Sequence, residues 1–307
     1  MKVLVATQKP FSAAAVKGIK DILTGAGHQV EVLENYAQQA DFVAAVADAE
    51  AIIIRSDKVT AEVIAAAPKL KIVVRAGAGY DNVDLEAASA AKVVVMNTPG
   101  QNANAVAELA IGMMIYMART QFTPSTGSEI QGKTVGIQAF GNVGRLVGKK
   151  AAALGMKVKA IDPFLPAEKI VEGGAVPAES LEDLYATSNY VSIHIPATPQ
   201  TVRSIGYDLI TKMPKGAVLV NTARKEVIDE AGLAKALEDR ADLKYATDVA
   251  PDNFAELKEK FGARVFATPK KMGAQTAEAN MNAGLAAANQ IVDFFANGNV
   301  RFQVNKF

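Results

Sequence analysis

The chain has 307 residues, of which half are apolar and 21% are charged, and its formal net charge is +1. This length and composition suit two globular domains and argue against disorder. A net charge this small argues against a broad surface that binds nucleic acid or an anionic membrane. We therefore expect any local cluster of cations to bind a small anionic ligand. The absence of cysteine excludes disulfides, thiolate metal sites and a cysteine nucleophile, and the two histidines, His28 and His194, are too few for a histidine-based metal site.

The N-terminal residues 1–7 look like a first strand and not like a secretory signal with a long apolar segment. The longest apolar stretch near the middle of the chain, residues 109–118, is too short to cross a bilayer. We therefore expect a cytoplasmic protein without a membrane partner.

Taken in chain order, β-branched runs alternate with alanine-rich helical stretches such as 12–24 and 61–67. The first series of runs lies at 3–6, 30–33, 51–54, 72–74 and 93–96, and the second at 134–138, 158–161, 190–195, 217–221, 243–248 and 264–267. A long apolar helix over about 104–119 and a turn-rich connector at 121–128 separate the two series. A final helix, about 276–297, is long enough to return to the first domain. The pattern predicts an α/β protein with two doubly wound parallel-sheet domains.

A glycine-rich turn joins the run at 134–138 to the helix that follows it. In the dinucleotide-binding fingerprint G-x-G-x-x-G, the second and third glycines correspond to Gly141 and Gly144, whereas the first is replaced by Ala139. A methyl group at this position is readily tolerated only if Ala139 has a negative φ. The helix N-terminus would offer N–H groups to phosphates.

Asp162 ends the next strand, about twenty residues after the turn. A carboxylate at this point can accept hydrogen bonds from the adenosine ribose hydroxyls and would repel the extra phosphate of NADP. Chance glycines in a βαβ unit are the alternative, but strand, turn, helix, strand and terminal acid occur here together. The segment therefore predicts NAD as the cofactor.

Several further motifs occur in the order typical of one enzyme family: RAGAGYDNVD at 75–84, MNTP at 96–99, AEL at 107–109, SIHIP at 192–196, NTAR at 221–224, TDV at 247–249, and TP with GA at 268–274. With them the chain resembles the D-2-hydroxyacid dehydrogenases over its whole length, and within them the members that act on 3-phosphoglycerate. The resemblance implies a flavodoxin-like substrate domain (1–98 and 279–307), a Rossmann-type NAD domain (99–278), and a homodimer formed through the NAD domains.

The resemblance also implies roles for single residues. Arg224 matches the catalytic arginine that binds the substrate carboxylate and polarises the C2 oxygen. Asp248 matches a residue near the nicotinamide carboxamide, and His194 one that is structural or cofactor-adjacent. The full set expected at the cofactor is Ala78, Ala139, Gly141, Asn142, Val143, Gly144, Asp162, His194, Ile195, Pro196, Thr222, Ala223, Arg224, Asp248, Gly273 and Ala274.

The chain departs from the family pattern at the general acid–base. The usual histidine is replaced by Lys271, counted back from the Gly-Ala pair, or by Lys270, counted forward from the proline; we prefer Lys271. The partner glutamate's position holds Asn253, next to Asp252. Short members with lysine in place of the histidine exist in the family. Burial and the charge of Arg224 are expected to lower the lysine pKa, which would favour the neutral amine needed for alcohol oxidation.

Cations at strand ends point to an anionic substrate. Arg55 and Lys58 follow one strand and Arg75 ends the next, and the expected substrate-binding set is Arg55, Lys58, Arg75, Ala76, Gly77 and Asn102. The alternative is that these cations are only solvated surface charges, which is most reasonable for Lys58.

The implied reaction is NAD-dependent oxidation of 3-phospho-D-glycerate to 3-phosphohydroxypyruvate, which starts phosphorylated serine biosynthesis. Because the sequence stops at Phe307, no regulatory domain is expected. A glyoxylate, hydroxypyruvate or D-lactate reductase and a non-catalytic NAD-binding regulator are the alternatives.

Overall fold

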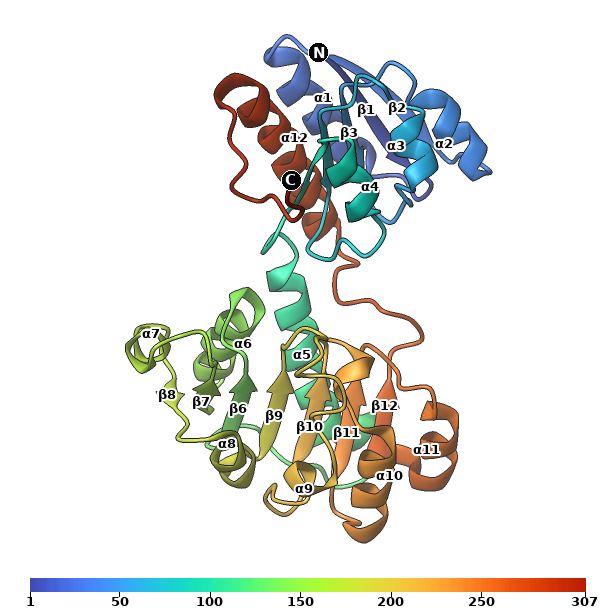
Figure 1. The fold of residues 1–307 in the computed structure, drawn as a ribbon. Helices are drawn as coiled ribbons and strands as arrows, with labels where there is room; N and C mark the ends of the chain where they lie inside the picture. The colour runs from blue at the N-terminus through green and yellow to red at the C-terminus, as the bar shows by residue number, and fades with distance from the viewer. The chain divides into compact units, whose positions relative to one another are not determined.

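The computed structural model describes all 307 residues, which form two compact units (Figure 1). Unit 1 comprises residues Met1–Asn102 and Gln275–Phe307, and unit 2 comprises Ala103–Ala274. The chain thus passes between the units at 102/103 and at 274/275, four residues from each boundary predicted above. No helix has both the length and the apolar character needed to cross a membrane.

Unit 1 contains a five-stranded parallel sheet in the order β2-β1-β3-β4-β5, so the prediction of a flavodoxin-like sheet is confirmed. Its strands are β1 (Lys2–Thr7), β2 (Gln29–Glu34), β3 (Ala51–Ile54), β4 (Ile72–Arg75) and β5 (Val94–Asn97). The strand order reverses between β1 and β3, and ligands of such sheets bind beyond the carboxyl ends of the strands near this point.

Helices cover both faces of this sheet (Figure 1). α1 (Ala13–Gly25) and α12 (Ala277–Asn297) share one apolar core, whereas α2 (Gln39–Ala45), α3 (Ala61–Ala65) and α4 (Leu85–Ala90) lie over the other face. Side-chain oxygens of Ser12, Thr60 and Asp84 cap α1, α3 and α4. The return of the last predicted helix to the first domain is confirmed, because α12 packs directly on α1.

Unit 2 contains a seven-stranded parallel sheet in the order β12-β11-β10-β9-β6-β7-β8, which is the Rossmann arrangement with one added strand. Its strands are β6 (Thr134–Gln138), β7 (Lys157–Ile161), β8 (Val176–Pro177), β9 (Tyr190–Ile193), β10 (Val218–Asn221), β11 (Lys244–Thr247) and β12 (Val265–Ala267). β9 and β10 are buried along their whole length, as inner strands of a parallel sheet with both faces covered should be.

The helices of unit 2 also form two layers. α5 (Ala103–Ala118), α6 (Asn142–Ala153) and α7 (Ala167–Glu172) share one core. α8 (Leu181–Thr187), α9 (Tyr207–Ile210), α10 (Glu230–Asp239) and α11 (Phe254–Phe261) share the other. Three short 3-10 turns, η1 (Thr120–Phe122), η2 (Lys225–Val227) and η3 (Gly262–Arg264), complete the unit.

Candidate active site

The predicted cofactor residues of unit 2 follow the carboxyl ends of its strands. Their sets are Ala139 with Gly141–Gly144 after β6, Asp162 after β7, His194–Pro196 after β9, Thr222–Arg224 after β10, Asp248 after β11, and Gly273 and Ala274 beyond β12. The strand order reverses between β6 and β9, and a ligand of this sheet is expected at that point. The fold therefore brings these residues to one edge of unit 2, whereas Ala78 belongs to unit 1.

The turn after β6 has the local geometry that a dinucleotide phosphate requires. A Cβ at Gly144 would lie 2.2 Å from the carbonyl oxygen of Ala139, so only glycine lets α6 approach β6 this closely. A Cβ at Gly141, the N-cap of α6, would meet no atom within 4 Å. The first amides of α6 point out of the helix N-terminus, where they can bind an anion. These residues fit the pyrophosphate of NAD.

Ala139 does not meet the condition stated above for a methyl group in this turn. This residue has a φ of +72°, in the left-handed region, and not the negative φ expected of a residue with a methyl group. Two hydrogen bonds hold the turn in this shape: the Ala139 amide donates to the Ile161 carbonyl at 2.9 Å, and the Phe140 amide donates to Asp162 Oδ2 at 2.9 Å. The turn thus has the backbone of a glycine turn without its first glycine.

The carboxylate of Asp162 has a structural role that the sequence pattern did not reveal. Besides the Phe140 amide it accepts the amide of Phe164 at Oδ1, at 2.9 Å. It therefore links the glycine-rich turn to the segment that follows β7. Each carboxylate oxygen keeps a further lone pair, so these bonds are compatible with the ribose contact predicted for Asp162.

His194 follows β9 directly, beside the point where the strand order reverses. Its ring Nε2 lies 2.9 Å from Ser192 Oγ, and its amide donates to the Gln138 carbonyl at 2.9 Å. Burial lowers the pKa of His194 to about 3. The imidazole is therefore neutral near pH 7, which agrees with the interpretation of His194 as a structural or cofactor-adjacent residue.

Asn221, which no motif singled out as functional, organises the loop that carries Arg224. Its side chain is fully buried, its Oδ1 accepts the Ala223 amide at 2.9 Å, and its Nδ2 donates to the Arg224 carbonyl at 2.9 Å. The Arg224 guanidinium is partly buried and donates to the Ala223 carbonyl at 2.9 Å. The hydroxyl of Thr222 is buried without a hydrogen-bond partner, as a group that meets a bound ligand can be.

Asp248 closes the turn that contains both candidate lysines. Its buried carboxylate accepts the Thr268 hydroxyl and the Met272 amide at Oδ1 and the Gly273 amide at Oδ2, all at 2.7 Å. Three donors from the start and the end of one turn thus converge on a single side chain. Asp248, which directly follows β11, therefore holds the segment 268–273 in place, although it lies at least 20 residues earlier in the sequence.

Lys270 and Lys271 both have exposed side chains in this turn. The burial that was expected to lower the pKa of Lys271 is therefore not observed. Lys271 directly precedes Met272, whose amide is bonded to Asp248, whereas Lys270 lies one residue further from this anchor. The backbone contacts thus define the position of Lys271 more closely.

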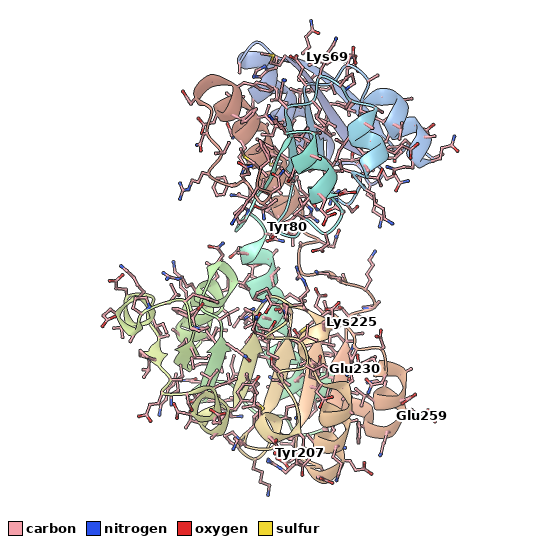
Figure 2. The ribbon with its side chains drawn as sticks, viewed as in Figure 1. Lys69, Tyr80, Tyr207, Lys225, Glu230 and Glu259 are labelled. Atoms are coloured by element: carbon pink, nitrogen blue, oxygen red, sulfur yellow. The ribbon has the colours of Figure 1, made fainter.

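At the position of the family's glutamate, Asn253 and the adjacent Asp252 take part in a different hydrogen-bond network. The amides of Asp252 and Asn253 donate to the two carboxylate oxygens of Glu230, at 2.9 and 3.2 Å. The exposed carboxylate of Asp252 pairs with Lys225 at 2.5 Å, and this contact raises the pKa of the lysine. Lys225 and Glu230 are labelled in Figure 2. Asp252 and Asn253 therefore belong to a surface network around Glu230.

In unit 1, Arg55 lies just beyond β3, next to the end of β4. Its guanidinium donates to the carbonyls of Lys9 and Pro10, both at 3.0 Å, and to the side-chain oxygen of Asn280 on α12. Desolvation lowers the pKa of Arg55. Buried Asp57, which the sequence analysis missed, accepts the amides of Gln8 at 2.6 Å and of Arg55 at 3.2 Å. Arg55 is thus a cation whose hydrogen bonds join the 9–10 segment to α12, which gives it a structural role.

The other predicted substrate residues of unit 1, and the predicted cofactor residue Ala78, differ in their surroundings. Arg75 ends β4, and its Nη1 would lie 1.5 Å from a Cβ at Gly77, whose φ is +146°; only glycine fits there. Ala76 is buried and Asn102 partly buried, whereas Lys58 and Ala78 are exposed. Arg55 and Arg75 thus lie at the ends of the adjacent strands β3 and β4, whereas Lys58 is a surface charge.

A family model described as "D-isomer specific 2-hydroxyacid dehydrogenase, NAD binding domain" matches residues 112–270. The chain is also 37% identical to D-3-phosphoglycerate dehydrogenase of Mycobacterium tuberculosis over 303 residues, or 92% of this chain. This chain belongs to the D-2-hydroxyacid dehydrogenase family. The predictions of the family and of NAD as its cofactor are thereby confirmed.

Solved and curated relatives of this family member differ in length and in name. A crystal structure of NAD+-bound 3-phosphoglycerate dehydrogenase from Entamoeba histolytica is 50% identical, has a TM-score of 0.89, and is matched over 100% of this chain and 99% of that one. Hydroxypyruvate reductase of Thermotoga maritima is 35% identical over 86% of this chain and 90% of its own length. The chain spans only 56% of the mycobacterial enzyme's length.

Proposed function

We propose that this chain is an NAD-dependent dehydrogenase that oxidises 3-phospho-D-glycerate at C2 to 3-phosphohydroxypyruvate. The observation that carries this proposal is the shared edge of unit 2, where the glycine-rich turn, the Arg224 loop and the 268–273 turn all follow strand ends. The family and the name of the Entamoeba relative support it. The reaction would be the first step of phosphorylated serine biosynthesis in a cytoplasmic enzyme.

In this proposal, the first amides of α6 bind the pyrophosphate of NAD, and Asp162 binds the adenosine ribose. NAD, when bound, supplies the hydride acceptor. The guanidinium of Arg224 binds the substrate carboxylate through paired hydrogen bonds and polarises the C2 oxygen. The amine of Lys271 takes the hydroxyl proton during oxidation and returns it during reduction.

The lysine assignment is tested by comparing Lys271→Ala with its neighbour Lys270→Ala. Both side chains are exposed, so both variants should fold normally. We expect Lys271→Ala to lose about 10²–10⁴-fold in kcat, the usual contribution of a general acid–base, and Lys270→Ala to stay near wild type. The reverse result would assign the role to Lys270. If neither variant loses activity, no lysine of this turn is the acid–base.

In this proposal, the phosphate specificity rests on Arg55, just beyond β3, and on Arg75, at the end of the adjacent strand β4. We expect Arg75→Ala to raise KM for phosphohydroxypyruvate at least tenfold and to leave KM for hydroxypyruvate nearly unchanged, because only the first substrate has a phosphate. Arg55→Ala is less selective as a test, since it also removes the contacts to Lys9, Pro10 and Asn280. Lys58→Ala is a matched control on the surface.

A hydroxypyruvate reductase is the second candidate, because the Thermotoga relative with that name is matched over 90% of its length. One assay distinguishes the candidates: NADH oxidation is followed with phosphohydroxypyruvate, hydroxypyruvate and glyoxylate at equal concentrations. A kcat/KM highest for phosphohydroxypyruvate supports the proposed function. A preference for either unphosphorylated substrate would replace it, and NADH binding without turnover of any of the three would indicate a non-catalytic regulator.

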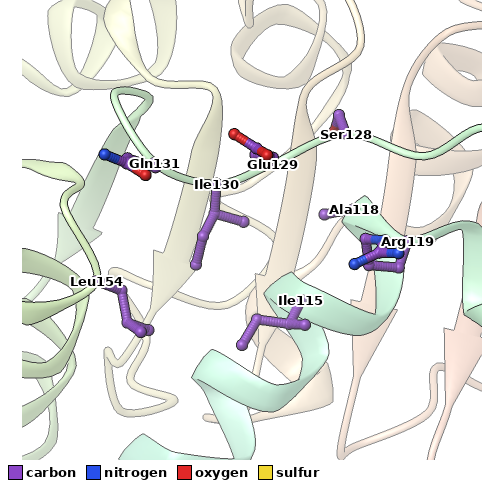
Figure 3. Close-up of a pocket in the computed structure, with 8 residues that line it drawn as sticks. All are labelled: Ile115, Ala118, Arg119, Ser128, Glu129, Ile130, Gln131 and Leu154. Atoms are coloured by element: carbon purple, nitrogen blue, oxygen red, sulfur yellow. The ribbon is translucent and has the colours of Figure 1, made fainter.

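We also propose that unit 2 forms the contact of a homodimer. A hollow of about 270 Å³ on this unit is lined by Ile115 and Ala118 of α5, by Ile130, and by Leu154 at the end of α6. Figure 3 shows Ile115, Ile130 and Leu154 around a common space, and 43% of Leu154 is exposed. Exposed apolar surface of this kind is typical of interfaces. Leu154→Asp should shift the mass measured by sedimentation to that of a monomer, whereas Val202→Asp should not.

A further inference from the structure

Unit 1 contains a polar pocket whose residues are not among the predicted catalytic or binding residues. It has a volume of about 260 Å³, room for several water molecules, each of which occupies roughly 30 Å³ in the liquid. One side is formed by the segment after β5, with Thr98 and Gln101. The other side comes from α12 and the following segment, with Asn289, Gln290, Asp293 and Phe302. Positions 289, 290 and 293 lie on one face of the helix.

Two side chains that line this pocket have buried polar atoms without a partner. Only 1% of Thr98 is exposed, and its hydroxyl makes no hydrogen bond. Gln290 donates through Nε2 to the Asn97 carbonyl at 3.0 Å, which leaves its Oε1 buried and without a donor. Buried polar atoms are nearly always paired in folded proteins, so two orphans at one pocket indicate a ligand that supplies the missing partners.

The remaining groups define the charge of that ligand. Asp293 is the only ionisable side chain that lines the pocket, and hydrogen bonds from Asn297 and Asn299 lower the pKa of its carboxyl group. Asn289 uses its Nδ2 to donate to the Leu285 carbonyl at 2.9 Å, which leaves its amide oxygen as an acceptor. The pocket thus offers an anion and several acceptors, and no cation.

We propose that this pocket binds a small organic ammonium compound, whose ammonium group donates to Gln290 Oε1 and faces the Asp293 carboxylate. The Thr98 hydroxyl bonds a second polar group of the same molecule, and its carbon chain lies against the Phe302 ring. This inference is independent of the reaction proposed above, because none of these side chains takes part in it.

Ethanolamine is a suitable probe, because it combines an ammonium with a hydroxyl, and ethylene glycol is its neutral counterpart. Each would be titrated into the ¹⁵N-labelled full chain at constant ionic strength, and the amide and side-chain shifts of the 98–101 and 286–293 segments would be followed. We expect saturable shifts with ethanolamine and much weaker ones with ethylene glycol. Since the binding region contains no proposed catalytic group, phosphohydroxypyruvate turnover is not needed as a readout.

Three variants make the test specific. Thr98→Val keeps the β-branched shape and removes a hydroxyl without a partner, so the variant should melt no lower than wild type and bind ethanolamine about fivefold more weakly or worse. Asp293→Asn should weaken binding similarly by removing the charge. Glu62→Gln, on the first turn of α3, is the control for a lost surface charge and should bind normally. Equal shifts with ethylene glycol, or no saturable shift at these segments, would overturn the proposal.

Discussion

The carboxylate of Asp248 accepts the backbone amide of Gly273 at 2.7 Å, although Asp248 directly follows β11 and Gly273 lies in the turn beyond β12. With Met272 and Thr268 on the same carboxylate, this contact makes Asp248 the anchor of the turn that carries Lys271. The backbone position of Lys271 thus depends on the side chain of Asp248, in the loop that follows β11.

Replacing Asp248 by asparagine should therefore affect catalysis more than binding. The amide group has one acceptor oxygen fewer and places an NH₂ group against a backbone N–H, so we expect a loss of about 1–3 kcal/mol in the free energy of unfolding. Displacement of the lysine by about 1 Å would lower kcat by roughly 10²-fold. Thr268→Val removes only the hydroxyl donor and should lower kcat less than tenfold. An unchanged kcat in Asp248→Asn would show that the turn keeps its shape without the carboxylate.

The positive φ of Ala139 leads to a second prediction. Glycine adopts this conformation without the Cβ penalty, so Ala139→Gly should raise the free energy of unfolding by about 1 kcal/mol. Ala152, exposed within α6, provides the opposite control: Ala152→Gly should destabilise by about 1 kcal/mol. Urea titrations of the two variants measure both effects. A destabilised Ala139→Gly variant would contradict the left-handed conformation at this position.

Gly141 and Gly144 should respond differently to alanine. At Gly144 the new methyl group would collide with the Ala139 carbonyl at 2.2 Å, which we expect to cost about 1–3 kcal/mol of stability and to abolish NAD binding. At Gly141 it would meet no protein atom within 4 Å, so stability should change by less than about 0.5 kcal/mol while NAD affinity falls at least tenfold. Calorimetric titration with NAD, paired with urea unfolding, separates the two. Normal NAD affinity in Gly141→Ala would move the pyrophosphate away from this turn.

His194 predicts a specific dependence of stability on pH. Its pKa falls from the ordinary 6.5 to about 3 on folding, so between these values the unfolded chain binds more protons at this residue. The contribution of neutral His194 is complete above pH 6.5 and is lost as the pH falls toward 3, with a slope of up to about 1.4 kcal/mol per pH unit. His194→Gln should flatten the decline between pH 6.5 and 5 relative to wild type. Parallel slopes in the two proteins would refute the low pKa.

Much of the fold follows from local patterns in the sequence. The run 51–54 is β-branched and buried on both faces, and it forms β3 with the predicted bounds. Ends of other strands differ by a residue or two: His194 and Ile195 lie beyond β9, since neither continues the sheet pairing of Ile193. β8 was missed because two residues, one of them proline, give no periodic signal.

The candidate site was less predictable, because its geometry depends on contacts between distant segments. The roles of Asn221 and Asp57 as buried acceptors, and of Asp248 as an anchor, require knowing which amides surround them. The conformation of Ala139 is likewise imposed by bonds to Ile161 and Asp162 from the next strand. The motifs identified Ala139 and Asp248, but the hydrogen bonds that explain their roles arise only in the folded chain.

α12 gives the protein an unusual order of assembly. Its Ala283, Ala287 and Ile291 complete the core over β1, β3 and β4, yet the ribosome makes them only after all of unit 2. Unit 2 comes from a single uninterrupted segment and has all its strands while α12 is still being made. A nascent chain held before residue 277 should therefore contain a protease-resistant unit 2 beside an open, unprotected unit 1, so that the last core helix to be synthesised closes the first sheet.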